Sequence, residues 1–333
     1  MSPQYIHVTD SSGNRGIGEA SPLKGFSLET EEQVRQDIAS GPPYNYPSTQ
    51  WAYDCACLDL HSKQDKCRIR DLLSEDPLEE LLVNDLFHAS DPAVLDDIER
   101  INPEYIKLKV GRQGIEEDIE LVNRVCGIAR QPIRLDANRA WDFETGKYFV
   151  ESINLDQIDY LEEPLINPQQ LSDLHYQTSV PYALDETLQN YQTSQEFIGE
   201  GVGVCREDTV SGGGSVEKAW GGIQKGVLYE GGVKKGFQEG KGAWEGIVKM
   251  ILDNCVGVKA LVVKPMLIGG MDKVRYLSDM AHERALDFVL THAMEGEVGR
   301  ELLLEVACGM HQKQVVAGLG LFEQCINTPS SRL

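Results

Sequence analysis

Residues 105–110 have the sequence Tyr-Ile-Lys-Leu-Lys-Val, and this stretch decides the fold prediction. Successive side chains of a β-strand point to opposite faces, so Ile106, Leu108 and Val110 share one face and Lys107 and Lys109 share the other. In a parallel sheet, helices cover the strands and make their surroundings apolar. The apolar face therefore packs under helices, and both lysines point inward. Two inward ammonium groups are costly unless opposite charges lie nearby.

The stretch belongs to a repeating pattern of short apolar strands and amphipathic helices that starts near residue 80. Eight strands are predicted, at residues 81–86, 105–110, 133–136, 158–162, 182–185, 260–264, 288–292 and 315–317. Eight strands alternating with helices over about 240 residues are typical of a (β/α)8 barrel of the TIM type. An open, doubly wound sheet stays open as an alternative, because strand order cannot be deduced from the sequence.

The first 78 residues are predicted to form a small α+β capping domain on a barrel made by residues 79–333. Residues 5–9 and 16–20 flank the turn signal Asp-Ser-Ser-Gly-Asn at 10–14, which indicates an antiparallel hairpin. Helical stretches are predicted around residues 31–38 and 49–63.

Composition excludes several classes of protein. The 333 residues include 31 Lys and Arg against 53 Asp and Glu, and the formal net charge of −22 disfavours binding to nucleic acid or anionic membrane surfaces. No apolar run approaches the roughly 18 to 20 residues that span a bilayer, and the amino terminus does not resemble a signal peptide. Eight scattered cysteines predict neither a disulfide framework nor a zinc site. We expect a soluble intracellular protein, in the cytoplasm or the plastid stroma.

Glycine is concentrated in one stretch. The chain has 32 glycines, and fifteen of them lie between Gly199 and Gly246. The interval from Asp185 to Lys264 is 79 residues, whereas Asp136 to Glu162 is 26 and Glu162 to Asp185 is 23. Glycine loses much backbone entropy on folding, so an insertion without a packed core is predicted at about residues 195–246. Translated non-coding sequence is an alternative origin for this stretch.

Five of the predicted strands bring a charged, inward-facing residue to their carboxyl ends, where barrel enzymes have their active sites. The same alternation that places the two lysines inside also places Arg134, Asp136, Glu162, Asp185 and Lys264 inside. Three carboxylates from successive strands suit a hard divalent cation, Mg²⁺ first and Mn²⁺ as a possibility. Lysines on two sides suit proton transfer at a carbon beside a carboxylate, with a lysine base whose pKa is lowered by burial and like charges.

Taken singly, each of these residues has a structural explanation. A Lys-x-Lys stretch is usually a solvated strand face, and an aspartate at a strand end is commonly a helix cap. His292, at a predicted strand end, is interpreted as structural. The argument for an internal metal and lysine site therefore rests on the strand parity, the order of the residues and the spacing of one strand-helix unit between carboxylates.

Several motifs together resemble the muconate-lactonizing branch of the enolase superfamily. They are IKLKVGR at 106–112, IRLDANRAW at 133–141, YLEEP at 160–164, ALDET at 183–187 and VVKPMLIGG at 262–270. Two further segments, GEASPLKGFSLET at 18–30 and THAMEGEVG at 291–299, are most similar to the o-succinylbenzoate synthase family within that branch.

The resemblance implies a role for each matching residue. Asp136, Glu162 and Asp185 would ligate Mg²⁺, Lys109 would act as base and then acid, and Lys264 would stabilise the enediolate and ring by cation–π contact. Lys107 would lower the pKa of Lys109. Further candidates for substrate contacts are Arg134, Asn138 and Thr291. The implied reaction is Mg²⁺-dependent dehydration of a small carboxylate, 2-succinyl-6-hydroxy-2,4-cyclohexadiene-1-carboxylate, to o-succinylbenzoate in menaquinone or phylloquinone biosynthesis.

Other activities stay open at this stage. Two lysines on opposite faces also suit a racemase, epimerase or cycloisomerase of the same branch. Dipeptide epimerases usually show a DxD after the eighth strand, and residues 317–322 have none. N-succinylamino acid racemization shares the synthase motifs. A catalytically inactive homologue is a third alternative. The resemblance implies a further strand and a flexible loop before Tyr5 that help close the site, and the predicted capping domain lacks them. The Gly-rich insertion is the second departure from the family pattern.

Overall fold

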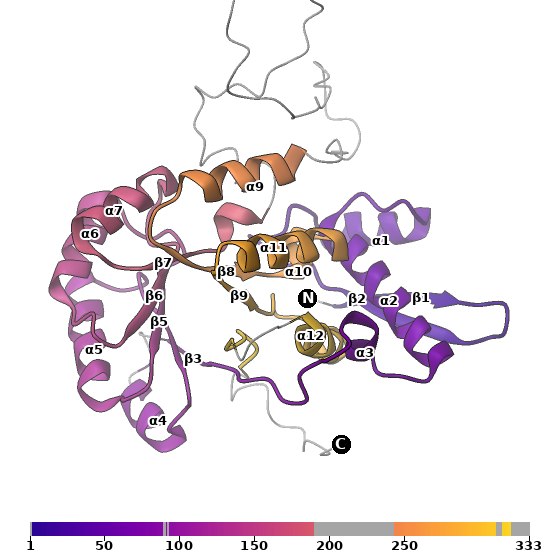
Figure 1. Cartoon of the computed structure of the whole chain (residues 1–333), viewed down its shortest axis with the longest axis horizontal. Coiled ribbons are helices and arrows are strands. Elements are labelled where there is room, and N and C mark those ends of the chain that lie inside the picture. The colour runs from indigo at the N-terminus through magenta and orange to yellow at the C-terminus, as the bar shows by residue number, and fades with distance from the viewer. Residues whose placement is uncertain (1, 89–90, 92, 190–242, 311–314, 321–333) are drawn as a thin grey trace, which may run out of the picture.

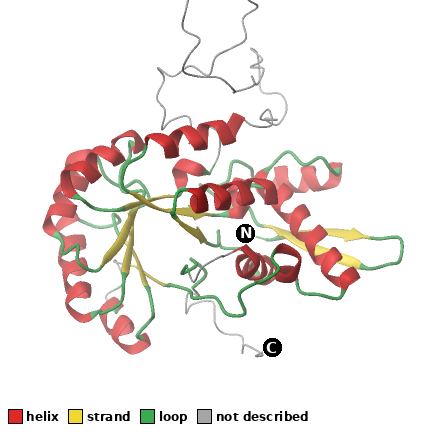
Figure 2. Cartoon of the chain, in the orientation of Figure 1, coloured by secondary structure: helices red, strands yellow, loops and turns green. Residues whose placement is uncertain are grey.

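The computed structural model describes residues 2–88, 91, 93–189, 243–310 and 315–320. Its larger part is a curled sheet of seven parallel strands that pair in chain order, surrounded by helices (Figures 1 and 2). The strands are β3 (Asp85–His88), β4 (Ile106–Lys109), β5 (Ile133–Asp136), β6 (Ile158–Glu162), β7 (Tyr182–Leu184), β8 (Val258–Val263) and β9 (Asp287–Leu290).

Helices follow the strands and cover the outside of the sheet. They are α4 (Val94–Ile101), α5 (Ile115–Ile128), α6 (Phe143–Ser152), α7 (Leu171–Thr178), α9 (Ala243–Asn254), α11 (Met271–Glu283) and α12 (Glu297–Met310). Short helical turns lie at α10 (Pro265–Ile268), η1 (Pro168–Gln170) and η2 (Glu186–Leu188).

Residues 315–320 occupy the place of the eighth strand. Val83 forms an isolated parallel bridge with Ala317, and Thr291 forms one with Gly318. This segment therefore connects the beginning of β3 with the end of β9 and closes the barrel, which confirms the predicted (β/α)8-type fold over the open sheet. The predicted first strand was placed too early: pairing with β4 starts only at Asp85, because residue 83 pairs instead with Ala317. The predicted strand 315–317 forms bridges rather than a continuous ladder.

The strand alternation inferred from residues 105–110 is present throughout the barrel. Ile106, Leu108, Leu135, Leu161 and Val263 belong to the large core that the strands share with the surrounding helices. A separate cluster fills the inside of the barrel and contains Tyr160, Ala183, Ala260, Val262 and Val289. Charged residues at the strand ends thus lie on the inner face, as the period of two dictates.

The amino-terminal part forms a small α+β capping domain. Strands β1 (Gln4–Thr9) and β2 (Arg15–Ala20) pair as an antiparallel hairpin, followed by α1 (Glu31–Ser40), α2 (Pro47–Asp65) and α3 (Ile69–Leu73). A Cβ atom on Gly18 would lie 1.7 Å from the Ala52 carbonyl oxygen, so glycine is needed where β2 crosses α2. The domain boundary near residue 78 stays a proposal.

Most of the predicted insertion at about 195–246 lies outside the described residues. Its predicted end is too late, because α9 already begins at Ala243. The Trp244 side chain is buried, and its indole Nε1 donates to the Leu188 carbonyl at 3.3 Å. Packing of this tryptophan extends the helix into the region predicted as insertion.

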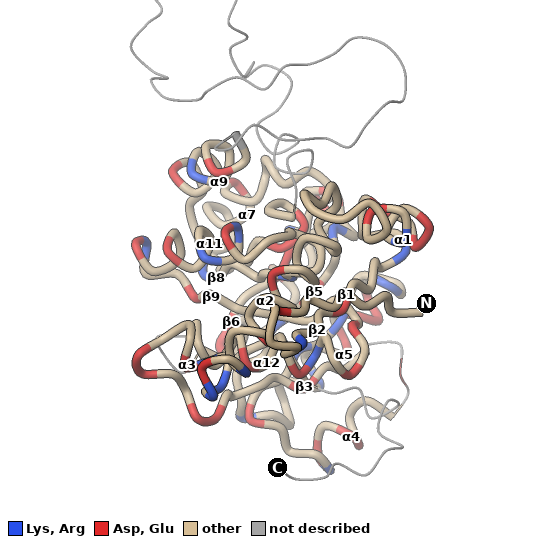
Figure 3. The backbone as a smooth tube through the Cα atoms, turned by 90° about the vertical axis from the view of Figure 1, so that its right-hand side faces the viewer, with Lys and Arg blue, Asp and Glu red and all other residues tan. Residues whose placement is uncertain are grey.

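Acidic residues are spread over the outer elements, including α1, α3 and α4, which fits the net charge of −22 (Figure 3). Among the described residues, no helix combines the length and the apolar character needed to cross a membrane.

Candidate active site

Strand register brings the predicted carboxylates to one end of the barrel. Lys109 is paired with Asp136, and Asp136 with Glu162. Glu162 is paired with Ala183, two residues before Asp185. Asp136, Glu162 and Asp185 are each fully buried. Three carboxylates therefore converge at the carboxyl ends of neighbouring strands.

The three predicted lysines lie among these carboxylates. The Lys107 ammonium is 2.9 and 2.7 Å from the two Glu162 carboxylate oxygens and 2.8 Å from Asp136 Oδ2. Lys109 Nζ lies 2.5 Å from Asp136 Oδ2 and donates to Asn138 Oδ1 at 2.6 Å. From the other side of the barrel, Lys264 forms an ion pair with Asp185. One cluster thus contains all six predicted catalytic and metal-binding residues.

Burial and charge shift the pKa values of this cluster in opposite directions. Burial disfavours ionisation of Asp136, but Lys107, Lys109 and Lys264 outweigh it and hold its pKa well below the usual range. Burial, followed by the charge of Asp136, raises the pKa of Glu162. Burial alone would lower the pKa of Lys107 and Lys264, yet the adjacent carboxylates raise both above their ordinary value. At these two lysines the charges of the nearby carboxylates therefore outweigh burial.

The donor set fits a divalent cation in kind. All three carboxylates offer oxygen, the ligand that Mg²⁺ prefers, and they come from neighbouring strands. After burial, the charges of Asp136 and Asp185 raise the pKa of Glu162, so the three carboxylates lie close enough to influence one another. As the side chains stand, no three His, Cys, Asp or Glu residues in the described part of the chain are close enough to hold a metal, because ammonium groups lie between the carboxylates.

Glu163 holds the turn that carries Asp185, a role that the sequence interpretation missed. Its Oε1 accepts from the Asp185 amide at 3.0 Å and from the Thr187 amide at 2.7 Å. Its Oε2 accepts from the Thr187 hydroxyl at 3.0 Å and from Arg139 Nε at 3.1 Å. The signal in the sequence is the doublet Glu162-Glu163, whose second member points to the side opposite the first.

Glu186 is the second residue that the sequence interpretation missed. Asn138 Nδ2 donates to Glu186 Oε1 at 2.8 Å, and Asn138 Oδ1 accepts from Lys109, so the amide connects Glu186 with a predicted catalytic lysine. The other carboxylate oxygen of Glu186 is buried without a hydrogen-bond partner. Burial, followed by the charge of Asp185, raises the pKa of Glu186.

Residues 98–217 match the family model described as enolase C-terminal domain-like. The chain therefore contains an enolase C-terminal-like domain. The o-succinylbenzoate synthase of Proteus mirabilis (strain HI4320) is 24% identical over 321 residues, covering 91% of this chain and 77% of that protein. The o-succinylbenzoate synthase of Enterobacter sp. (strain 638) is 26% identical over 334 residues, covering 95% and 81%.

Several enzymes of known structure share the fold. A dipeptide epimerase from Enterococcus faecalis V583 has a TM-score of 0.68 at 17% identity, covering 95% of this chain and 84% of that one. The o-succinylbenzoate synthase of Thermosynechococcus elongatus BP-1, solved with Mg in its active site, has a TM-score of 0.60 at 18% identity with the same coverage. The muconate lactonizing enzyme of Pseudomonas putida has a TM-score of 0.66 at 16% identity, covering 92% and 80%.

Two of the predicted substrate contacts make structural bonds within the barrel. Arg134 Nε lies 3.0 Å from Asp159 Oδ2, Nη1 donates to the Val316 carbonyl at 2.7 Å, and the guanidinium stacks 4.9 Å from the centre of the Tyr160 ring. Thr291 Oγ1 donates to the Gly318 carbonyl at 2.7 Å. Both residues thereby tie the segment at 315–320 into the barrel. Asn138, the third predicted contact, lies beside Lys109.

His292 follows β9 and lies close to Lys264. Burial, then the charge of Lys264, lowers the pKa of His292 to about 4, so its imidazole is neutral at physiological pH. Its Nδ1 accepts from the Met294 amide at 3.2 Å. These contacts fit the structural role that the sequence suggests.

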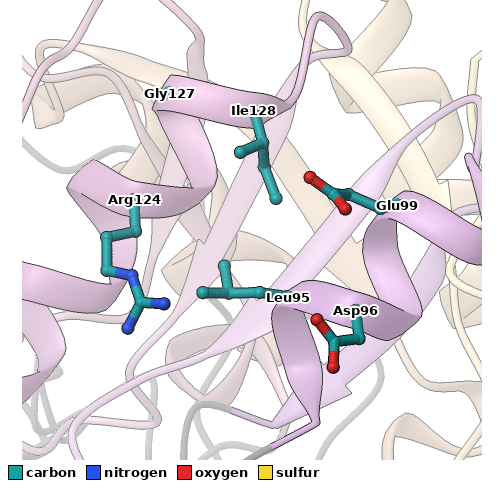
Figure 4. Close-up of a pocket in the computed structure, with 6 residues that line it drawn as sticks. All are labelled: Leu95, Asp96, Glu99, Arg124, Gly127 and Ile128. Carbon is teal, nitrogen blue, oxygen red and sulfur yellow. The ribbon is translucent and has the colours of Figure 1, made fainter.

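A separate surface pocket of about 360 Å³ lies between α4 and α5. Figure 4 shows Leu95 and Ile128 facing each other across it, with Asp96, Glu99 and Arg124 around them. It is on the helical outside of the barrel, away from the strand ends that carry the lysines and carboxylates.

Proposed function

We propose that this protein is an o-succinylbenzoate synthase, which dehydrates 2-succinyl-6-hydroxy-2,4-cyclohexadiene-1-carboxylate to o-succinylbenzoate and water in menaquinone or phylloquinone biosynthesis. The observation that supports it best is the cluster of Lys109, Asp136, Glu162, Asp185 and Lys264 at one end of the barrel. The names of relatives that align with more than 90% of the chain point to the same reaction.

In the proposed reaction, Lys109 Nζ removes the proton from the ring carbon that bears the carboxylate. The electron pair of that C–H bond moves into the carboxylate to give an enediolate, and it returns to the ring as the neighbouring C–OH bond breaks. Lys109 gives its proton to the departing hydroxide, which leaves as water. Aromatisation of the ring drives the step forward.

The remaining residues of the cluster would orient Lys109 and stabilise the charge that develops on the substrate. Asn138 and Asp136 hold Lys109 Nζ in place. Lys264 faces it from the end of β8, where its ammonium would stabilise the enediolate and the ring. Asp136, Glu162 and Asp185 would hold Mg²⁺, which supplies positive charge beside the substrate carboxylate when bound. Lys107, between Asp136 and Glu162, would orient those two carboxylates, and its charge lowers the pKa of each.

The test is a Mg²⁺-dependent assay that follows formation of o-succinylbenzoate from the cyclohexadiene acid. Lys109→Ala and Lys264→Ala are each expected to lower kcat by at least about a hundredfold, the usual size of a general acid-base contribution. Lys249→Ala, at an exposed position of α9, is the matched control. Chelation of the metal should abolish turnover, and added Mg²⁺ should restore it. Turnover that survives Lys109→Ala would refute the assigned base.

A second candidate activity is racemisation or epimerisation within the same superfamily. Lys109 on β4 and Lys264 at the end of β8 approach from different sides of the barrel, which suits proton removal on one face and return on the other. The same preparation should therefore be tested with N-succinylamino acids in ²H₂O. Deuterium incorporation without any dehydration of the cyclohexadiene acid would favour this activity.

A further inference from the structure

A buried glutamate from the capping domain contacts the start of a barrel helix. Glu19, on β2, is only 1% exposed. Its Oε1 accepts from the Gly296 amide at 2.5 Å, and its Oε2 accepts from the Gly299 amide at 2.9 Å. Gly296 immediately precedes α12 and Gly299 lies in its first turn. The carboxylate thus satisfies amides at a helix start that would otherwise lack acceptors, and it complements the positive end of the helix dipole.

The two glycines leave room for this carboxylate. A Cβ atom on Gly296 would lie 3.0 Å from both Glu19 carboxylate oxygens, and one on Gly299 would lie 3.2 Å from Glu19 Cδ and 2.7 Å from Glu295 Cβ. Any larger residue would push the carboxylate away from the amides. The glycines of Gly296-x-x-Gly299 therefore leave space for the Glu19 side chain from the capping domain.

Ser21, which bonds to the same glutamate, contacts the other segment that flanks Lys264. Ser21 Oγ donates to Glu19 Oε1 at 2.6 Å, and the Ser21 amide lies 3.4 Å from the sulfur of Met266, two residues after Lys264. Residues 19–21 thus touch both α12 and the turn that begins at Lys264.

The loop that Glu19 holds lies next to Lys264. The Thr291 amide donates to the carbonyl of Val263, the residue before Lys264, at 2.9 Å. Residues 291–296 lead from there to the start of α12. The charge of Lys264 lowers the pKa of both His292 and Glu295 within this loop, although burial is the largest influence on each.

We propose that Glu19 is a positioning residue for Lys264: by holding the start of α12, it fixes loop 291–296 against the lysine that faces the substrate. The effect on catalysis rests on the proposed function, whereas the contact between Glu19 and α12 is independent of it. The capping domain then acts on the reaction through the carboxylate, and loss of that contact loosens the wall of the site beside Lys264.

Glu19→Gln tests the inference in the full chain. The amide keeps the size of the side chain but has only one acceptor oxygen, so one of the two helix amides loses its partner. Glu301→Gln, at an exposed position of α12, is the matched control. Glu19→Asp, which keeps the charge on a shorter side chain, is expected to recover part of what Glu19→Gln loses.

Three measurements distinguish the possible outcomes. Hydrogen exchange of peptides that contain residues 293–300 should be at least about tenfold faster in Glu19→Gln, since protection there depends on the lost bond. Acetylation of Lys264 by a small anhydride, followed by mass spectrometry, should become several times faster. In the dehydration assay, kcat should fall by about tenfold while KM changes by less than about twofold, the pattern of an interaction made in the transition state.

If hydrogen exchange at residues 293–300 is unchanged in Glu19→Gln, Glu19 does not hold the start of α12 and the proposal is overturned. Faster exchange with unchanged Lys264 acetylation and unchanged kcat would overturn the positioning role and leave only a structural one. If the unmodified protein does not turn over the cyclohexadiene acid at all, the proposed function fails, while exchange and acetylation still decide whether Glu19 positions Lys264.

Discussion

Glu295 offers a sharp test of the electrostatics at the junction of the two domains. Its side chain is 5% exposed, its Oε2 accepts from the Ala293 amide at 2.6 Å, and its Oε1 is buried without a partner. Burial, with a further contribution from the charge of Glu19, raises the pKa of Glu295 from 4.5 to about 7. The perturbation is Glu295→Gln, which keeps the shape and removes the charge.

The pKa gives both the sign and the size of the effect. The folded protein holds the Glu295 proton more tightly than the unfolded chain, so protonation stabilises the fold. That contribution is complete below about pH 4.5 and is lost as the pH rises through about 7. At about 1.4 kcal/mol for each pKa unit, the loss is about 3 kcal/mol at high pH. A protein with the Glu295→Gln substitution has no such loss, because the amide does not ionise.

The assay is urea unfolding of both proteins, followed by circular dichroism at pH values near 5 and near 8. The free energy of unfolding of Glu295→Gln, minus that of the unsubstituted protein, should rise by about 2 to 3 kcal/mol between the two. His292, with its pKa lowered to about 4, changes stability in the opposite direction, but it is present in both proteins and cancels in the difference. If the difference in the free energy of unfolding between the two proteins is the same at both pH values, the pKa of Glu295 is not raised and the reasoning is refuted.

Three further outcomes are expected. Gly18→Ala should destabilise the protein by at least about 2 kcal/mol in urea unfolding, because its Cβ would overlap the Ala52 carbonyl. Gly127→Ala, within α5 where a Cβ meets no atom within 4 Å, should instead stabilise by about 0.5 to 1 kcal/mol in the same experiment. Glu163→Gln should weaken Mg²⁺ binding at least about tenfold in calorimetry, because Glu163 orients the turn that carries Asp185; unchanged affinity would contradict that role.

The sequence by itself determined the side of the barrel on which each charged residue lies. A β-strand alternates its side chains with a period of two, so the apolar residues at 106 and 108 force Lys107 and Lys109 inward wherever the strand is covered by helices. The same rule applies to Leu135 and Asp136, and to Leu161 and Glu162. Because the rule is local, it needs no knowledge of distant contacts, and it was sufficient to group the six residues of the site.

Only the tertiary structure decided which residues meet across the chain. Arg134 has the same inward parity as Asp136, yet Asp159 and the Val316 carbonyl engage its guanidinium within the barrel. Glu163 and Glu186 are ordinary carboxylates in the sequence, and they matter because the backbone amides of Asp185 and Thr187 and the side chain of Asn138 are brought to them. Glu19 contacts Gly296 and Gly299 across more than 270 residues of chain. Strand parity is fixed by the geometry of one residue after another, whereas these contacts depend on how separate elements pack, and no local pattern encodes that.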